Sequence, residues 1–334
     1  MLPMSLLSVN DLHVGFGSTE ILRGVSFDLE PGETLGVVGE SGCGKSMTGF
    51  AIMGMLQAPG KITQGSIKLE GTELVGMKER DMRKIRGQDI ALVMQDPFTS
   101  LNPMMRIADQ IAEAYTLHER ISKAEANRRA IDMLDKVGVP APESSARKYP
   151  HHLSGGQRQR VVIAMAFACK PKVLIADEPT TALDVTLQAQ ILRLLRELQE
   201  KEGTSVILIS HDIGAIASVA HRMAVFYAGK IIEIGKSENV LRQASHPYTR
   251  SLLMSLPRAG QDRLESIGGQ PPDFAKLTGE CSFAPRCPLR IEPCAVEPEL
   301  LFDKNGTGCA CWRSQEVYSL PFGRSITELV QTPS

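Results

Sequence analysis

Residues 39–46 read GESGCGKS and stand between two segments of different character. The apolar run 34–38 before them predicts a buried strand, and the residues after them predict a helix to about Leu56, ahead of Pro59 and Gly60. A glycine-rich turn between a strand and a helix, with the spacing G-x4-G-K-[ST], is typical of a phosphate-binding loop. Its glycines let backbone N–H groups face phosphate oxygens, and the helix start adds a positive partial charge. The alternative is a chance glycine-rich turn, which the flanking strand and helix disfavour.

Two side chains of this loop have specific roles in the hypothesis. Lys45 is expected to reach the β and γ phosphates of a nucleotide, and the Ser46 hydroxyl is expected to bind Mg²⁺. The residues of this segment predicted to contact the nucleotide are Gly39, Ser41, Gly42, Cys43, Gly44, Lys45, Ser46 and Met47.

A second apolar run, 172–176, predicts a strand that ends in two adjacent acids, Asp177 and Glu178. Asp177, at the end of the strand, can hold Mg²⁺ directly or through water. Glu178 points in a different direction and can polarise a water molecule for in-line attack on the γ phosphate. Taken alone, the pair is also compatible with a strand followed by a helix-capping acid. The presence of a phosphate-binding loop in the same chain disfavours that alternative.

A second candidate anion site lies at the start of a predicted helix that ends near Cys169. Ser154 is expected to be the N-cap of this helix, which leaves free N–H groups and the positive end of the helix dipole. Gly155 and Gly156, followed by Gln157, allow a phosphate to approach the backbone closely. The same residues taken alone would also fit an ordinary capped turn.

The rest of the chain predicts an α/β fold with a parallel sheet, because strand and helix patterns alternate. Residues 5–35 predict antiparallel strands, and residues 103–168 predict a helical insertion. After about residue 257 the chain is rich in Pro, Gly and Cys and shows little periodicity. A length of 334 residues favours about two domains. We therefore expect a nucleotide-binding domain over 5–255 and a small Cys-rich C-terminal region over 256–334.

Composition narrows the classes of function. The chain has 37 Lys and Arg against 38 Asp and Glu, which disfavours a dedicated nucleic-acid binder. The longest uncharged stretch, 46–60, is shorter than the roughly 20 apolar residues of a membrane span. The N-terminus lacks the pattern of a secretory signal, so we expect a cytosolic location with reduced thiols. In that setting the five cysteines between Cys281 and Cys311 favour a metal site over disulfides.

In combination these motifs resemble those of ATP-binding-cassette (ABC) ATPases over about residues 5–255. The phosphate loop resembles the Walker A motif, Asp177 and Glu178 resemble Walker B with its catalytic glutamate, and 153–157 resembles the signature motif. Phe16 resembles the aromatic residue that stacks on adenine, and Gln95 resembles the glutamine of the Q-loop. Residues Thr181-Ala182-Leu183-Asp184 resemble the D-loop, and His211 resembles the switch histidine.

The resemblance implies a P-loop NTPase fold and the hydrolysis of ATP with Mg²⁺. It implies two cassettes that face each other head to tail, with ATP between the phosphate loop of one chain and the signature helix of the other. Glu178, His211 and Gln95 would be the catalytic residues, and Gln95 would also lie at the Mg²⁺ held by Ser46 and Asp177. Every catalytic position of the family is present, which implies an active half-site on this chain.

Two further stretches, 96–103 and 246–249, resemble the peptide and nickel importer branch of the family. The cysteines at the end of the chain are similar to the C-terminal region of oligopeptide and dipeptide transporter ATPases, which can carry a [4Fe–4S] cluster. The resemblance implies Cys281, Cys287, Cys294 and Cys311 as its ligands, with Cys309 as a spare thiol. Thiolates also suit zinc, and reduced cysteines without a metal are a further alternative.

The expected function is ATP hydrolysis that powers an importer of dipeptides or oligopeptides. The resemblance places the chain at the cytoplasmic face of the inner membrane as a peripheral subunit. Its implied partners are two transmembrane permease subunits, a second, paralogous ATPase subunit and an extracytoplasmic solute-binding protein, with no nucleic acid. One alternative is the same machine with nickel, glutathione or a sugar-linked compound as cargo. Another is a soluble cassette ATPase of translation or DNA repair, which the near-neutral charge disfavours.

Overall fold

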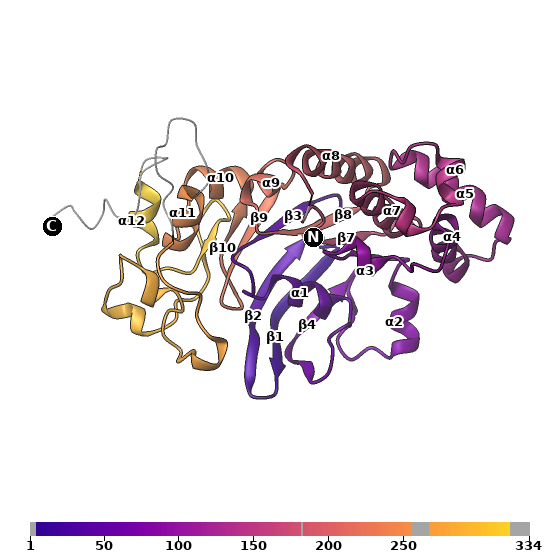
Figure 1. Cartoon of the computed structure of the whole chain (residues 1–334). Coiled ribbons are helices and arrows are strands. Elements are labelled where there is room, and N and C mark those ends of the chain that lie inside the picture. Colours follow the sequence, from indigo (N-terminus) through magenta and orange to yellow (C-terminus); the bar gives the residue numbers. More distant parts are fainter. Residues whose placement is uncertain (1–4, 182, 256–266, 321–334) are drawn as a thin grey trace.

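The structure, a computed structural model, describes residues 5–181, 183–255 and 267–320, and Figure 1 shows how its sheets and helices are arranged. The smaller sheet is antiparallel, and its strand order is β2-β1-β4-β5. Its strands are β1 (Leu7–Phe16), β2 (Thr19–Leu29), β4 (Gly60–Leu69) and β5 (Thr72–Glu73). The antiparallel strands predicted within residues 5–35 are confirmed, with Leu7 opposite Leu29 and Phe16 opposite Thr19.

The larger sheet has eight strands in the order β11-β12-β10-β9-β3-β8-β7-β6. Parallel pairing joins β6, β7, β8, β3 and β9, so the carboxyl ends of these strands lie at one edge. Their bounds are β3 (Thr34–Val38), β6 (Ile90–Val93), β7 (Val173–Asp177), β8 (Ser205–Ser210) and β9 (Arg222–Tyr227). Antiparallel pairing adds β10 (Lys230–Lys236), β12 (Gly308–Cys309) and β11 (Leu301–Phe302). The predicted α/β fold with a parallel sheet is confirmed.

Two hydrophobic clusters cover opposite faces of the larger sheet, and alternate residues of β7 contribute to each. Leu174 and Ala176 belong to the cluster that includes the helical insertion, whereas Val173 and Ile175 belong to the cluster that includes the small antiparallel sheet. Every residue of β7 is buried. Strands covered on both faces read as continuous apolar runs, which is why this segment shows no polar alternation.

Residues 107–167, within the predicted helical insertion, form four α-helices, which lie at one end of the molecule in Figure 1. Its helices are α4 (Ile107–His118), α5 (Lys123–Lys136), α6 (Pro142–Ala146) and α7 (Gly155–Phe167), with a 3₁₀ turn at Pro150–His152. The other helices before residue 256 are α1 (Lys45–Ile52), α2 (Glu79–Ile85), α3 (Pro97–Ser100), α8 (Val185–Glu202), α9 (Ile213–Ala217), α10 (Ser237–Arg242) and α11 (Pro247–Met254). The helix predicted to reach Leu56 ends earlier because Gly54 adopts the left-handed conformation (φ 59°).

The C-terminal stretch 267–320 has few regular elements and is tied to the larger sheet. Glu233 of β10 lies opposite Cys309 of β12, so this stretch extends the sheet. Its other elements are 3₁₀ turns at Phe274–Lys276, Ala284–Arg286 and Glu292–Ala295 and the helix α12 (Ser314–Ser319).

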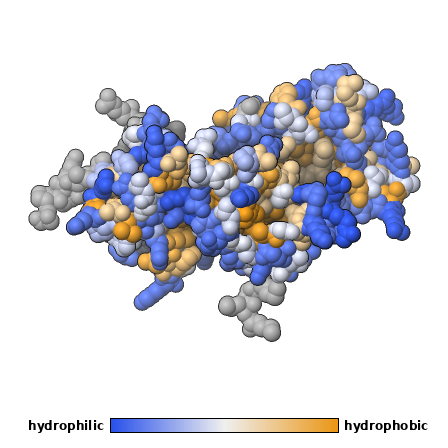
Figure 2. Space-filling view, turned by 90° about the horizontal axis from the view of Figure 1, so that it is seen from below, coloured by the Kyte–Doolittle hydropathy of each residue, from blue (hydrophilic) through white to orange (hydrophobic). Residues whose placement is uncertain are grey.

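Within the described ranges, none of the helices combines the length and apolar character needed to cross a bilayer. Figure 2 shows one face of the molecule, on which apolar side chains form separate patches among hydrophilic ones.

Candidate active site

The phosphate loop joins β3 to α1 and has the backbone geometry that the sequence predicts. Gly39, Gly42 and Gly44 all have positive φ angles, of 153°, 80° and 106°. Such conformations favour glycine because a Cβ atom would clash with the backbone. Gly44 is the N-cap of α1 and supplies no side-chain cap, so the N–H groups of the first helical turn are left to face a ligand. This arrangement can bind an anion.

The ammonium group of Lys45 is buried in this loop and held by its backbone. Its Nζ donates hydrogen bonds to the carbonyl oxygens of Gly39 (2.8 Å) and Glu40 (3.0 Å). A cavity of about 480 Å³ adjoins the loop. The residues that line it are Ile21, Ser41, Gly42, Gly44, Lys45, Ser46, Met47, Gln95, Glu178, Thr181 and His211.

Ser46 and Asp177 come together at the carboxyl edge of the sheet. The Ser46 hydroxyl donates a hydrogen bond to Oδ1 of Asp177 at 2.9 Å. Burial raises the pKa of Asp177, and the hydrogen bond from Ser46 opposes that effect. A hydroxyl and a carboxylate at this distance are suitable ligands for Mg²⁺, since hard cations prefer oxygen. Gln95, the third expected metal ligand, lines the same cavity.

Glu178 follows Asp177, but its side chain does not lie beside Ser46 as that of Asp177 does. The backbone of Glu178 has a positive φ of 46°, which gives the side chain a different direction. Three side chains contact its Oε2 atom: Gln95 Nε2 donates at 2.9 Å, Thr181 Oγ1 donates at 2.8 Å, and His211 Nδ1 lies 3.2 Å away. Non-glycine residues in this conformation cost free energy and are concentrated at functional sites. Glu178 thus contacts Gln95 and His211, the two other residues predicted to act in catalysis.

Thr181 contacts Glu178, although the sequence motifs did not predict it as a site residue. It lies three residues after Glu178, in the turn that leads to α8, and lines the cavity. Its place in the D-loop resemblance was the available signal. Ala182 of that motif lies outside the described residues. Ile21, from β2, also lines the cavity, and no sequence pattern identifies it.

The signature residues form a capped helix start but do not line this cavity. Ser154 Oγ accepts a hydrogen bond from the Gln157 N–H at 3.3 Å, and Gln157 Oε1 accepts one from the Ser154 N–H at 3.0 Å. This capping box confirms Ser154 as the N-cap of α7. Ser154 is exposed, and a Cβ added at Gly155 would meet open space. The end of α7 is therefore accessible to a second molecule.

Phe16 lies at the end of β1 and its ring packs against Gly60. It is only partly buried and belongs to the apolar cluster of the small sheet. The cavity beside the phosphate loop is lined by other residues. The structure thus puts this aromatic ring near the edge of the small sheet, and its contact with adenine stays a prediction.

Four of the five C-terminal cysteines line one small apolar cavity, namely Cys281, Cys287, Cys294 and Cys311. Cys309 is instead buried in β12. Burial raises the pKa of Cys281 to about 11 and that of Cys311 to about 12, so both are thiols near pH 7. Among the described residues, no three His, Cys, Asp or Glu side chains are arranged to hold a single metal ion.

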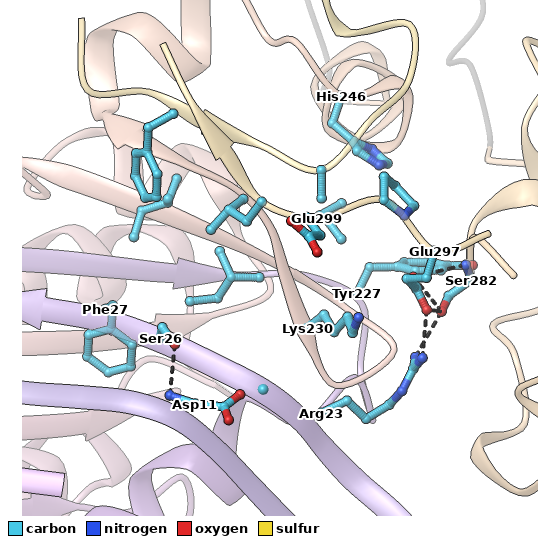
Figure 3. A pocket seen from close by; sticks show the side chains of 18 of the residues that line it. Asp11, Arg23, Ser26, Phe27, Tyr227, Lys230, His246, Ser282, Glu297 and Glu299 are labelled. Atoms are coloured by element: carbon cyan, nitrogen blue, oxygen red, sulfur yellow. Dashed lines mark hydrogen bonds and ion pairs between the residues drawn. The ribbon is translucent and has the colours of Figure 1, made fainter. Parts of the chain in front are cut away.

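A larger cavity, of about 620 Å³, lies between β1, β2, the β9–β10 hairpin and the C-terminal stretch. Figure 3 shows Arg23 at one side of it, reaching toward Glu297 and Ser282, with Lys230 and Glu299 directed into the space. Arg23 Nη2 lies 2.6 Å from Glu297 Oε2, and Nη1 donates to Ser282 Oγ at 2.9 Å. This ion pair ties the C-terminal stretch to β2.

Two family models match the chain. One, described as ABC transporter, covers residues 22–181, and the other, described as oligopeptide/dipeptide transporter, C-terminal region, covers residues 232–294.

Curated relatives match over almost the whole length. The dipeptide transport ATP-binding protein DppD of Bacillus subtilis is 48% identical over 92% of this chain and 94% of its own. The oligopeptide transport ATP-binding protein OppD of Salmonella typhimurium is 46% identical over 93% and 94%. A solved structure of the dimeric ATP-binding cassette MJ0796 in a post-hydrolysis state, bound to ADP and Pi, is similar with a TM-score of 0.62 at 28% identity. That similarity covers 69% of this chain and 98% of MJ0796.

Proposed function

Because the chain belongs to the ATP-binding subunits of the ABC transporters for dipeptides and oligopeptides, we propose that it hydrolyses ATP to power peptide import. The observation that carries this proposal is the cavity where a phosphate loop, an Mg²⁺-compatible Ser46–Asp177 pair and Glu178 meet. Nickel and glutathione importers, and cassette ATPases of translation or DNA repair, are not favoured, since the relatives named above are dipeptide and oligopeptide transport proteins.

The hydrolytic roles follow from the contacts around Glu178. Its carboxylate would polarise the attacking water. His211 and Gln95 both contact this carboxylate. His211 would also contact the γ phosphate, and Gln95 would reach Mg²⁺. ATP with Mg²⁺ would be bound by Lys45, Ser46 and Asp177, and by the N–H groups at the start of α1. We assign these functions to a nucleotide-binding domain over 5–255 that contains the helical subdomain 103–168.

Pairing of two cassettes supplies the part of the site that one chain lacks. The exposed end of α7, with Ser154 and Gly155, lies outside the cavity lined by the phosphate loop. A second ATPase subunit in head-to-tail orientation would place its signature helix over the γ phosphate, where the free N–H groups and the helix dipole favour the anion. We propose that this partner is a paralogous chain.

The surface proposed to receive the permease subunits lies beside Gln95. Two apolar side chains just after it in sequence are largely exposed, Phe98 (61%) and Met104 (83%). The guanidinium of Arg158, on α7, lies 4.3 Å from the centroid of the Phe98 ring. A permease segment bound here would thus contact both the Gln95 loop and the signature helix. The proposed position is peripheral, on the cytoplasmic face of the membrane, with an extracytoplasmic solute-binding protein delivering the peptide.

We also propose a [4Fe–4S] cluster bound by Cys281, Cys287, Cys294 and Cys311, with zinc as the less favoured metal. Support comes from the cavity that these four side chains share and from their donor set, since thiolates suit iron–sulfur clusters. Because the thiols have raised pKa values, loading would release protons. Anaerobically purified protein should contain iron and labile sulfide and absorb near about 400 nm. Colourless protein with stoichiometric zinc would reverse the assignment.

The peptide-import proposal is tested in vesicles that contain the permease subunits and the partner ATPase, with the solute-binding protein added. ATP-dependent uptake of labelled dipeptides should require this chain. Glu178→Gln should retain ATP binding but lose nearly all hydrolysis and uptake, because it removes the water-polarising carboxylate. Glu200→Gln, an exposed change on α8 in an ion pair with Arg196, is the matched control. Normal turnover in Glu178→Gln would contradict the assigned role.

A further inference from the structure

We infer that Arg286 is a positioning residue for the phosphate loop, which it holds through the side chain of Glu40. Arg286 immediately precedes Cys287 in the C-terminal stretch, and Glu40 is the second residue of the loop 39–46. The two residues are 246 positions apart in the sequence, yet they form a two-pronged ion pair. This inference rests on the proposed nucleotide site and adds a link between that site and the cysteine-bearing segment.

The pair has the geometry of a strong contact. Arg286 Nη1 lies 2.7 Å from Oε2 of Glu40, and Nη2 lies 2.9 Å from Oε1. Only 5% of the Arg286 side chain is exposed. Its Nε donates to the Gly268 carbonyl at 2.8 Å, and the Tyr227 hydroxyl lies 3.3 Å from Nη1. Two parallel hydrogen bonds fix both distance and orientation, unlike the single contact of a surface ion pair.

Glu40 in turn connects this contact to the residue that is proposed to bind phosphate. Its carbonyl oxygen accepts a hydrogen bond from Lys45 Nζ, and its N–H donates to the Tyr248 hydroxyl at 2.9 Å. The side chain, the N–H and the carbonyl of Glu40 are thus all engaged. A shift of the Glu40 side chain would change the place of the Lys45 ammonium group.

The charge of Glu40 gives the pair a second role. A carboxylate on a loop that must bind a polyphosphate would repel it, and an opposite charge at hydrogen-bond distance offsets that repulsion. Loss of the guanidinium would leave the Glu40 carboxylate unpaired and partly buried on the loop that is proposed to bind the phosphates. A displacement of the cysteine-bearing segment would therefore weaken nucleotide binding through one side chain.

The test measures equilibrium binding of a fluorescent ATP analogue with Mg²⁺ to the purified full-length chain. Arg286→Met should weaken binding by on the order of tenfold, and Arg286→Lys by less, since lysine keeps the charge but not the two-pronged geometry. The deficit of Arg286→Met should shrink as ionic strength rises, because salt screens the repulsion. The double variant Glu40→Gln/Arg286→Met should recover only the part of the affinity that is lost to the unpaired carboxylate, because the two-pronged contact that positions the loop is still absent.

Arg23→Met is the matched control, because Arg23 also forms a part-buried ion pair with the C-terminal stretch, and the hydrogen bonds that its side chain donates go to Ala228, Ser282 and Glu297 and not to the loop 39–46. It should lower the melting temperature yet leave nucleotide affinity unchanged. Wild-type affinity in Arg286→Met, or full wild-type affinity in the double variant, would overturn the positioning role while leaving the proposed function intact. If Lys45→Ala instead binds the ATP analogue as tightly as the wild type, the nucleotide site itself is refuted.

Discussion

Replacing Gly39 by alanine should destabilise the protein in the absence of any nucleotide. Gly39 has a φ of 153°, and a Cβ atom there would collide with the carbonyl oxygen of Phe226 and lie 2.9 Å from Sγ of Cys43. An L-residue with such a backbone costs about 1–2 kcal/mol, and overpacking against a strand costs a further 1–3 kcal/mol or so. We therefore expect a loss of about 3 kcal/mol in the free energy of unfolding.

Gly42 offers a control within the same loop. Its φ is also positive, at 80°, but an added Cβ would have no neighbour within 4 Å. Gly42→Ala should then cost only the conformational part, about 1 kcal/mol. Urea denaturation of both variants and the wild type, followed by circular dichroism, gives the three free energies of unfolding under one set of conditions.

The comparison separates steric contact from backbone conformation. If the two variants lose equal stability, the contact between an added Cβ at position 39 and the Phe226 carbonyl of β9 does not contribute to the free energy of unfolding. If Gly39→Ala is as stable as the wild type, the backbone at this position does not have the conformation described.

Three other predictions concern α7, α11 and the cysteines. Ser154→Ala should lower the free energy of unfolding by about 1 kcal/mol, because the N-cap is lost. It should also lower the ATPase rate of the paired subunits and leave nucleotide binding to the single chain unchanged. A normal ATPase rate would contradict the role of α7. Burial lowers the pKa of His246 to about 3, so between about pH 3 and 6.5 the unfolded chain binds a proton that the folded chain does not. Acidification over that range should destabilise the wild type relative to His246→Asn, which keeps the cap, by about 1.4 kcal/mol per pH unit. If urea denaturation shows the same pH dependence of the free energy of unfolding for both proteins, His246 is not a buried neutral imidazole. Cys311→Ser should lose iron and labile sulfide whereas Cys309→Ser should retain both, and the reverse result would exchange the two assignments.

The parts of the site that the sequence predicts are those encoded by local spacing. The glycine positions of the phosphate loop, the N-cap Ser154 and the acids after β7 each depend on residues a few positions apart, so a linear pattern suffices. Thr181 could not be predicted in this way, because its hydroxyl contacts Glu178 only as a result of the positive φ angle of Glu178. Phe16 shows the opposite case, since the family resemblance implies contact with adenine but does not reveal its packing on Gly60.

Long-range contacts in the irregular C-terminal stretch could not be predicted in the same way. The pairing of Arg286 with Glu40 joins two segments without periodicity, and no spacing rule links them. The grouping of four cysteines around one cavity followed only from a family resemblance, and their chain spacing alone did not decide between Cys309 and Cys311. Their separation in the structure comes from β12, which directs Cys309 into the sheet.

The pairing of β10 with β12 affects how this protein must be made. During translation, the edge of β10 stays without a partner until residues 308–309 have emerged from the ribosome, more than 70 positions after the strand itself. Unpaired N–H and C=O groups along such an edge are a template for aggregation. Truncation near residue 255 should therefore yield insoluble material and not a smaller working enzyme, although every residue of the phosphate loop would still be present.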